Sequence, residues 1–413
     1  MDATCQIDGF GPLNIARPAS VMELGDIVRQ AATDGAAIYP IAGQTQLGLG
    51  NPPIKPGLAV DLRGLDAVID FPARDMTITV QAGIAVGRLQ ALLAAENLRL
   101  PIDVPHMDRA TLGGIIAINT SGPRRLGFGT LRDYVIGISA INDDGGEFKA
   151  GGRVVKNVAG YDLCKLLVGS LGTLGIITQV TLKLRPLAAE QALISLGCET
   201  EGLEALLMRL HATRTRPVCI ELLNRGAAEV VFRAAGLTAA ESGWSLVVGF
   251  EGNEESVRWQ VQQLIEEVGP APELEARVGF TAQPLGDALV GASSEGAATT
   301  FKASVLSSAV AGFCRSVDID PDRPIVQAHA GTGIVWGHWP AGMTEARAAE
   351  LCAAWRDLAA QSHGSVVVQH CSPKWKQSVP VWDSVASGWL MRVIKEKFDP
   401  RRIFNPGRFV EGI

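Results

Sequence analysis

Residues 152–186 read GRVVKNVAGYDLCKLLVGSLGTLGIITQVTLKLRP, and this stretch decides the fold. Its second half contains a glycine-rich loop, Gly169–Gly175, and a β-branched run, Ile176–Leu184, that predicts a strand. Glycines let a backbone approach a ligand closely, and the strand fixes the loop in space. The first half, Lys156–Asp162, contains a charged ammonium, an amide, a phenol and a carboxylate within seven residues. Ordinary core segments rarely have such a composition. The stretch therefore predicts a ligand-binding loop.

Two more glycine-containing blocks lie upstream. The block Ile41–Gln46, with the sequence IAGQTQ, follows a predicted strand over residues 36–41, and successive amides of such a turn can bind an anion. The block Thr111–Gly114 opens an apolar helix, where paired glycines would leave free amides for a diphosphate, and Asn119–Gly122 follows it. Taken alone, each block is also typical of an ordinary strand-to-loop turn or helix start.

The ordered blocks together resemble a known family. The segment KNVAGYDL (156–163) followed by GSLGTLGIIT (169–178) resembles the FAD-binding E subunits of bacterial glycolate oxidases, which are FAD-linked oxidases of the vanillyl-alcohol oxidase type. The resemblance is strong over residues 36–186 and returns at the C-terminus in FDP (398–400) and NPGRF (405–409). It implies an FAD cofactor. No histidine lies in the first glycine block, where some relatives attach flavin covalently, so we expect noncovalent FAD.

The resemblance also implies which residues hold the cofactor. The family usually has a run of glycines in the first block, whereas this chain has Ala42 and Gln44 at two of those positions. A glutamine at positive φ is unfavourable, so the exact shape of this loop is left open. The expected cofactor-binding residues are Ile41, Ala42, Gly43, Gln44, Thr45, Gln46, Thr111, Gly113, Gly114, Ser121, Gly122, Gly172, Gly175 and Ile177.

The expected fold class is α+β. The resemblance implies a two-part PCMH-type FAD-binding domain over residues 1–186, an α+β cap domain over 187–340, and a C-terminal segment, 341–413, that packs back on the FAD site. Local signals agree with the first part. Ser20 and Glu23 form a capping box ahead of a helical pattern that Gly35 ends.

Further along the chain, the local pattern alternates. The turn Asp143–Gly146 predicts a hairpin. In the expected cap domain, Glu229–Phe232 and Ser245–Phe250 read as strands, whereas Leu203–Leu210 and Glu254–Val268 read as helices.

Composition narrows the class of protein. A net charge of −6 and a pI near 5.6 argue against nucleic acid as a partner. The seven cysteines contain no CxxC pair, which argues against a cysteine-bound iron–sulfur cluster and indicates a reducing compartment. The N-terminus lacks the pattern of a signal peptide, and no apolar run approaches the length of a membrane span. We therefore expect a cytoplasmic protein that reaches the membrane only through partners.

Catalytic residues are harder to assign. Relatives that oxidise D-2-hydroxy acids often carry a metal-binding pattern of His, Gly, Asp, Gly, Asn and a second His. The corresponding segment begins at His329, but Thr332 and Ile334 replace the Asp and Asn, and the second histidine is missing, so we expect no metal. His329 and His370 are candidate bases, although a lone histidine at a strand end is usually structural. Arg408 is a candidate carboxylate clamp or an anchor for the C-terminus.

These observations leave three functions open. The resemblance favours a subunit of a glycolate-oxidising complex, with a flavin-containing sister subunit, an iron–sulfur subunit and a small 2-hydroxy acid as partners. A stand-alone FAD-dependent D-2-hydroxy-acid (D-lactate) dehydrogenase and a non-catalytic flavin-binding scaffold are the alternatives. The sequence does not separate glycolate from D-lactate, because one methyl group is worth only about 1–3 kcal/mol of discrimination.

Overall fold

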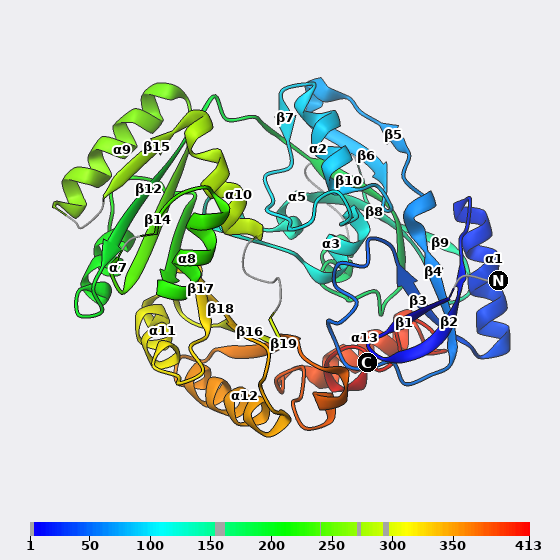
Figure 1. The fold of residues 1–413 in the computed structure, drawn as a ribbon. Coiled ribbons are helices and arrows are strands. Elements are labelled where there is room, and N and C mark those ends of the chain that lie inside the picture. Colours follow the sequence, from blue (N-terminus) through cyan, green and yellow to red (C-terminus); the bar gives the residue numbers. More distant parts are fainter. Residues whose placement is uncertain (1–3, 153–161, 240, 271–273, 292–296) are drawn as a thin grey trace. The chain divides into compact units, whose positions relative to one another are not determined.

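The computed structural model describes residues 4–152, 162–239, 241–270, 274–291 and 297–413 of the chain (Figure 1). The segment Lys156–Asp162 that the sequence analysis singled out therefore lies, except for Asp162, outside the described residues. The chain forms two compact units: the first comprises residues 1–121, 130–187 and 384–413, and the second comprises 122–129 and 188–383.

This division differs from the expected domain boundaries. Residues 341–383 belong to the second unit, because strand β19 (Ser365–His370) pairs along β16 (Thr299–Ser304). The chain returns to the first unit only at Ser384. The short segment 122–129 also belongs to the second unit, where the amide of Gly127 donates to the carbonyl of Val218.

The described residues of the first unit form three sheets. One is a mixed sheet in the order β1-β2-β4-β3, another is antiparallel in the order β5-β6-β10-β8-β9, and the third pairs β11 with β7. The strands are β1 (Thr4–Ile7), β2 (Phe10–Ala16), β3 (Ala37–Ile41), β4 (Gly57–Asp61), β5 (Val68–Asp70), β6 (Thr77–Gln81), β7 (Leu98–Arg99), β8 (Val135–Ile141), β9 (Glu147–Gly151), β10 (Ile176–Lys183) and β11 (Arg185–Pro186). The helices are α1 (Val21–Asp34), α2 (Val86–Ala94), α3 (Leu112–Ile118), α5 (Leu131–Tyr134), α6 (Cys164–Leu167) and α13 (Gly388–Phe398).

Helix α1 follows its local signals closely. The Ser20 side chain accepts from the amide of Glu23, and the Glu23 carboxylate accepts from the amide of Ala19 at 2.7 Å. Gly35 ends the helix at φ 63°, a left-handed conformation that glycine adopts without a steric penalty. The helix buries Leu24 and Val28 against Ile38 and its neighbours, which fixes β3 and the loop that follows it.

The second unit is built on one antiparallel sheet in the order β15-β12-β14-β13-β17-β18-β16-β19. Its strands, besides β16 and β19, are β12 (Glu190–Cys198), β13 (Cys219–Asn224), β14 (Trp244–Gly252), β15 (Glu275–Val278), β17 (Ile325–His329) and β18 (Ile334–Trp339). Its helices are α4 (Arg125–Phe128), α7 (Leu203–His211), α8 (Arg225–Ala234), α9 (Glu254–Val268), α10 (Gln283–Gly291), α11 (Val310–Asp318) and α12 (Glu345–Ala360).

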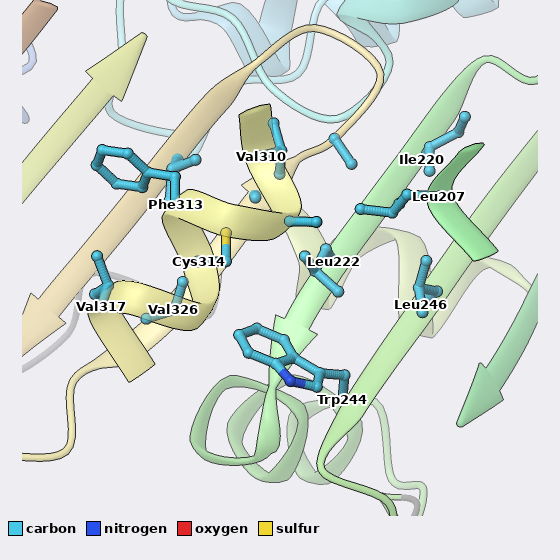
Figure 2. Close-up of a cluster of buried hydrophobic side chains, with 14 of the residues drawn as sticks. Leu207, Ile220, Leu222, Trp244, Leu246, Val310, Phe313, Cys314, Val317 and Val326 are labelled. Carbon is cyan, nitrogen blue, oxygen red and sulfur yellow. The ribbon is translucent and has the colours of Figure 1, made fainter. Parts of the chain in front are cut away.

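The larger core of this unit lies on one face of the sheet. Helices α7, α9, α11 and α12 contribute to it, and Figure 2 shows Val310 and Cys314 of α11 beside Leu222 of β13, with Trp244 and Leu246 of β14 further along the sheet. A smaller core on the opposite face packs α8 and α10 against β13 and β14. Within the described residues, no helix is both long enough and apolar enough to cross a bilayer.

The strand expected at Glu229–Phe232 was wrong, because these residues lie inside α8. The Asn224 side chain caps this helix by accepting from the amide of Ala227 at 2.9 Å. Val231 and Phe232 are buried in the smaller core, so a helical face accounts for the apolar run that we took for a strand. Helix α9 and strand β14 agree with the expected Glu254–Val268 and Ser245–Phe250.

His338 is a buried titratable group in the sheet of the second unit. It is 2% exposed, and its Nδ1 lies 3.0 Å from Oγ1 of Thr300 on β16. Its Nε2 has no hydrogen-bond partner among the described residues. Burial lowers the pKa of His338 to about 4, because a charged ring would lose its hydration there.

We predict that His338 makes the fold sensitive to acid. The unfolded side chain has a pKa near 6.5, so the stability contributed by the neutral ring is complete above about pH 6.5 and is lost as the pH falls toward 4. In that window His338→Gln should flatten the pH dependence of the free energy of unfolding by up to about 1.4 kcal/mol per pH unit. Urea unfolding at several pH values checks this, and parallel curves for the two proteins would contradict it.

Candidate functional site

A pocket in the first unit gathers the three glycine-containing blocks. Twelve of the fourteen expected cofactor-binding residues line it, whereas Ser121 and Gly122 do not. The pocket-lining residues that we expected are Ile41, Ala42, Gly43, Gln44, Thr45, Gln46, Thr111, Gly113, Gly114, Gly172, Gly175 and Ile177. The fold therefore brings together segments that lie more than a hundred residues apart in the sequence.

The first block offers backbone amides. Among the described residues, no acceptor is found for the amides of residues 42–46, although the loop lines the pocket. Gln44 adopts φ 55°, a left-handed conformation that is unfavourable for a non-glycine residue. Consecutive amides without a protein acceptor form a site for an anion such as a phosphate group.

Gly43 is fixed by crowding rather than by its own φ angle. A Cβ atom there would lie 1.9 Å from the carbonyl oxygen of Arg109, which is far inside van der Waals contact. The Arg109 guanidinium in turn donates to the carbonyl of Gly43 at 3.3 Å. The segment that contains Arg109 therefore packs directly on the loop, and no other residue type fits at position 43 without a shift of the backbone.

The second block differs from its expected role. Thr111 caps α3, and its Oγ1 accepts from the amide of Gly114. The amides of Leu112 and Gly113 donate to the carbonyls of Ile84 and Ala82 at 2.9 and 2.7 Å. The expected free amides are therefore already used, because β6 and the chain that follows it pack against the start of the helix. This block contributes a close-packed glycine surface to the pocket.

The third block supplies a loop with a strained backbone. Gly175 has φ 148°, and a Cβ atom there would lie 2.8 Å from the carbonyl oxygen of Ile141 on β8. Leu171 adopts φ 53°, which is unfavourable for a leucine. Both residues line the pocket, so the shape of this loop determines part of its wall.

The C-terminal segment completes the pocket. Asn405, which our sequence analysis did not single out, lines it and donates from Nδ2 to the carbonyl of Leu171 at 2.7 Å. Its position beside Pro406 and Gly407 in the NPGRF motif was the available signal.

Arg408 also lines the pocket, but its guanidinium is engaged elsewhere. It donates to the carbonyls of Leu47, Leu49 and Asn51 at 2.6–2.8 Å. Burial lowers the pKa of Arg408, and the charge of Asp8, 3.6 Å away, opposes that shift. These contacts describe an anchor that ties the C-terminus to the chain after the first block, which was one of the two roles considered for Arg408.

The second unit contains a buried pair of titratable side chains. His329, at the end of β17, is 5% exposed, and its Nδ1 lies 2.8 and 2.9 Å from the two carboxylate oxygens of Glu221. Glu221 is fully buried in β13 and also accepts from Nε2 of Gln327 at 2.9 Å. A carboxylate bound to Nδ1 orients the ring and leaves Nε2 as the exchangeable position. Glu221 escaped our sequence analysis, although one carboxylate in an apolar strand was a signal.

The remaining candidates lie apart from this pair. His370 is an exposed residue at the end of β19. Arg124 of the second unit forms an ion pair with Glu251 at 3.1 Å. Within the parts of the chain that the structure describes, no three His, Cys, Asp or Glu side chains form a group that could hold a metal ion.

Two protein-family models match the chain. The model described as "FAD binding domain" matches residues 12–151, and the model described as "FAD linked oxidases, C-terminal domain" matches residues 190–409. The second match alone covers more than half of the chain.

Individual relatives extend this match. Glycolate oxidase subunit GlcE of Escherichia coli (strain K12) is 34% identical over 180 residues, which cover 43% of this chain and 50% of the relative. D-lactate dehydrogenase of Archaeoglobus fulgidus is 26% identical over 412 residues, covering 96% of this chain and 91% of the relative. The chain spans half or less of the length of several other curated relatives.

A solved structure of alkyldihydroxyacetonephosphate synthase matches the fold. It has a TM-score of 0.68 and 18% sequence identity, and it covers 95% of this chain and 75% of the synthase. The expected α+β class and the FAD-binding fold are therefore confirmed.

The residues of the pocket fit the cofactor that the family implies. The amides of the first block have no protein acceptor, which suits the diphosphate of FAD, and the glycines at positions 43 and 175 let neighbouring backbone pack closely to form the wall of the pocket. The two family models identify the cofactor as FAD. With both family models in sequence order and a pocket that suits their common cofactor, the chain belongs to the FAD-linked oxidases.

Proposed function

We propose that this chain is the FAD-binding subunit of a complex that oxidises glycolate to glyoxylate. The pocket of the first unit supports FAD binding, because the amides of residues 42–46 lie in its lining without a protein acceptor. Residues 42–46 would hold the diphosphate, and the backbone at Gly172 and Gly175 would lie along the rings. When bound, FAD supplies a two-electron acceptor for a hydride.

Two features favour a subunit over a self-sufficient enzyme. Named relatives include two glycolate oxidase subunits, from Bacillus subtilis and Escherichia coli. The seven cysteines contain no CxxC pair that would suit an iron–sulfur cluster, so single electrons would leave through another protein. We infer that the partners are a sister flavin subunit and an iron–sulfur subunit, and that any membrane contact runs through them.

A second candidate is a stand-alone FAD-dependent D-2-hydroxy-acid dehydrogenase. It is favoured by the D-lactate dehydrogenase that aligns along nearly the whole chain. The Glu221–His329 pair also supports it, because oxidation of a 2-hydroxy acid removes a hydroxyl proton together with a hydride. Glu221 would hold the proton of Nδ1, and Nε2 of His329 would accept the hydroxyl proton.

The purified protein should be yellow, and acid precipitation should release its FAD intact into the supernatant. The reason is that the first glycine block, residues 41–46, contains no histidine for covalent attachment. Absorption spectra of the supernatant and the pellet measure this. Flavin that stays in the pellet would contradict noncovalent binding, and a colourless protein that takes up no added FAD would contradict the cofactor site.

Gly175→Val should abolish FAD binding, whereas Cys164→Ala should leave it unchanged. A valine Cβ at position 175 would press on the Ile141 carbonyl, and φ 148° is unfavourable for a β-branched residue. Cys164 is also buried, but its Sγ contacts the carbonyl of Ala150 and does not line the pocket. Flavin content per folded protein, with folding checked by circular dichroism, decides it. Equal flavin in both variants would remove the third block from the site.

The isolated chain should turn over glycolate slowly or not at all. The His329 segment lacks the acidic residue and the second histidine of the metal-binding pattern, and reoxidation of FAD would depend on a partner. Stopped-flow mixing with glycolate and with D-lactate measures the reduction directly. Full bleaching of the flavin by either acid at about 10 per second, a typical turnover rate, would favour the stand-alone dehydrogenase.

A further inference from the structure

A buried lysine lies beneath the pocket in the first unit. Lys395 of α13 is 3% exposed, and its Nζ donates to Oδ2 of Asp399, itself fully buried, at 2.7 Å. Burial lowers the pKa of Lys395, and the charge of Asp399 opposes that shift. Removing two charges from water costs free energy that their attraction does not always recover, and apolar replacements for such pairs are often neutral or stabilising. The fold alone therefore does not explain why this pair is present.

The other hydrogen bonds of Lys395 point to its role. Its Nζ also donates to the carbonyl of Thr173 at 2.7 Å and to the carbonyl of Phe404 at 3.0 Å. An ammonium group has three donors, so all are used. Asp399 is equally occupied, because its oxygens accept from the amides of Ile403 and Phe404 at 3.0 and 2.9 Å.

Thr173 belongs to the strained loop of the pocket. Its neighbour Leu171 has φ 53°, a left-handed conformation that is unfavourable for a leucine, and it lines the pocket. A backbone in such regions persists only where its surroundings hold it. Two tethers from the C-terminal segment do so: Lys395 holds the carbonyl of Thr173, and Asn405 holds the carbonyl of Leu171.

We propose that Lys395 is a positioning residue for the cofactor: its ammonium fixes the loop 171–175 in the shape that binds FAD. This inference rests on the proposed function of the pocket. It differs from a purely structural role, in which the Lys395–Asp399 pair only attaches α13 to the first unit. The two roles separate if the stability of the fold can be restored without the tether to Thr173.

Three variants make that separation. Lys395→Met removes the tether but leaves Asp399 charged and buried, so it should lower the urea midpoint of unfolding as well as FAD affinity. Lys395→Met with Asp399→Asn removes both charges and keeps one acceptor oxygen, which can serve the amide of Ile403 or that of Phe404. Lys397→Met, at an exposed position of the same helix, is the matched control for loss of one lysine.

We expect the double variant to have a higher urea midpoint than Lys395→Met, because no unpaired charge stays buried, but not to recover the affinity for FAD. Its dissociation constant for FAD, from flavin fluorescence quenching of the apoprotein, should be at least about tenfold higher than that of the wild type, the cost of one lost charge-assisted hydrogen bond. Hydrogen exchange of the apoprotein should accelerate about tenfold in a peptide spanning 169–175 and stay unchanged in β6, which lies elsewhere in the unit. Lys397→Met should match the wild type in every measurement.

The outcomes distinguish the two ideas. If the double variant binds FAD as tightly as the wild type and exchanges normally over 169–175, the positioning role is wrong and the pair serves only the fold. If the wild type itself binds no FAD, the proposed function fails. The exchange data on the apoprotein still decide whether the shape of the loop depends on Lys395.

Discussion

The pocket depends on a backbone pairing between the two ends of the chain. The amide of Ile38 in β3 donates to the carbonyl of Ile403 at 2.7 Å, and the amide of Asn405 donates to the carbonyl of Ile38 at 3.0 Å. These bonds place the C-terminal segment beside the strand that leads into the first glycine block. From there Asn405 and Lys395 reach the third block, and Arg408 reaches the chain after the first. Without this pairing, two of the three blocks would lose their supports.

Much of the first unit could be predicted because its signals are local. The capping box at Ser20, the glycine at position 35 and the hairpin turn at 143–146 each act within a few residues, and the structure contains the elements that they predict.

In the second unit, the prediction of a strand at Glu229–Phe232 was wrong because the local signal was ambiguous. A short apolar run fits both a strand and one face of a helix, and the cap at Asn224 that decides between them lies outside the run.

The residues that sequence reasoning missed owe their roles to distant partners. Glu221 matters because it meets His329, more than a hundred residues later, across the pairing of β13 with β17. The amides at the start of α3 looked free in the sequence, but the carbonyls of Ala82 and Ile84 take them up. No local sequence pattern predicts either of these contacts. Hydrogen-bond partners across a sheet or between packed loops become visible only when the strand order is known.

Cofactor binding and substrate choice depend on different groups of a protein chain. The pocket works largely through backbone groups: amides at 42–46, carbonyls at Leu171 and Thr173, and close approach at Gly43. Backbone groups tolerate wide sequence change, and a solved structure that is only 18% identical shares the fold. Recognition of a substrate depends instead on particular side chains. A few substitutions can alter those side chains without disturbing the fold, so one FAD-binding fold can serve several substrates.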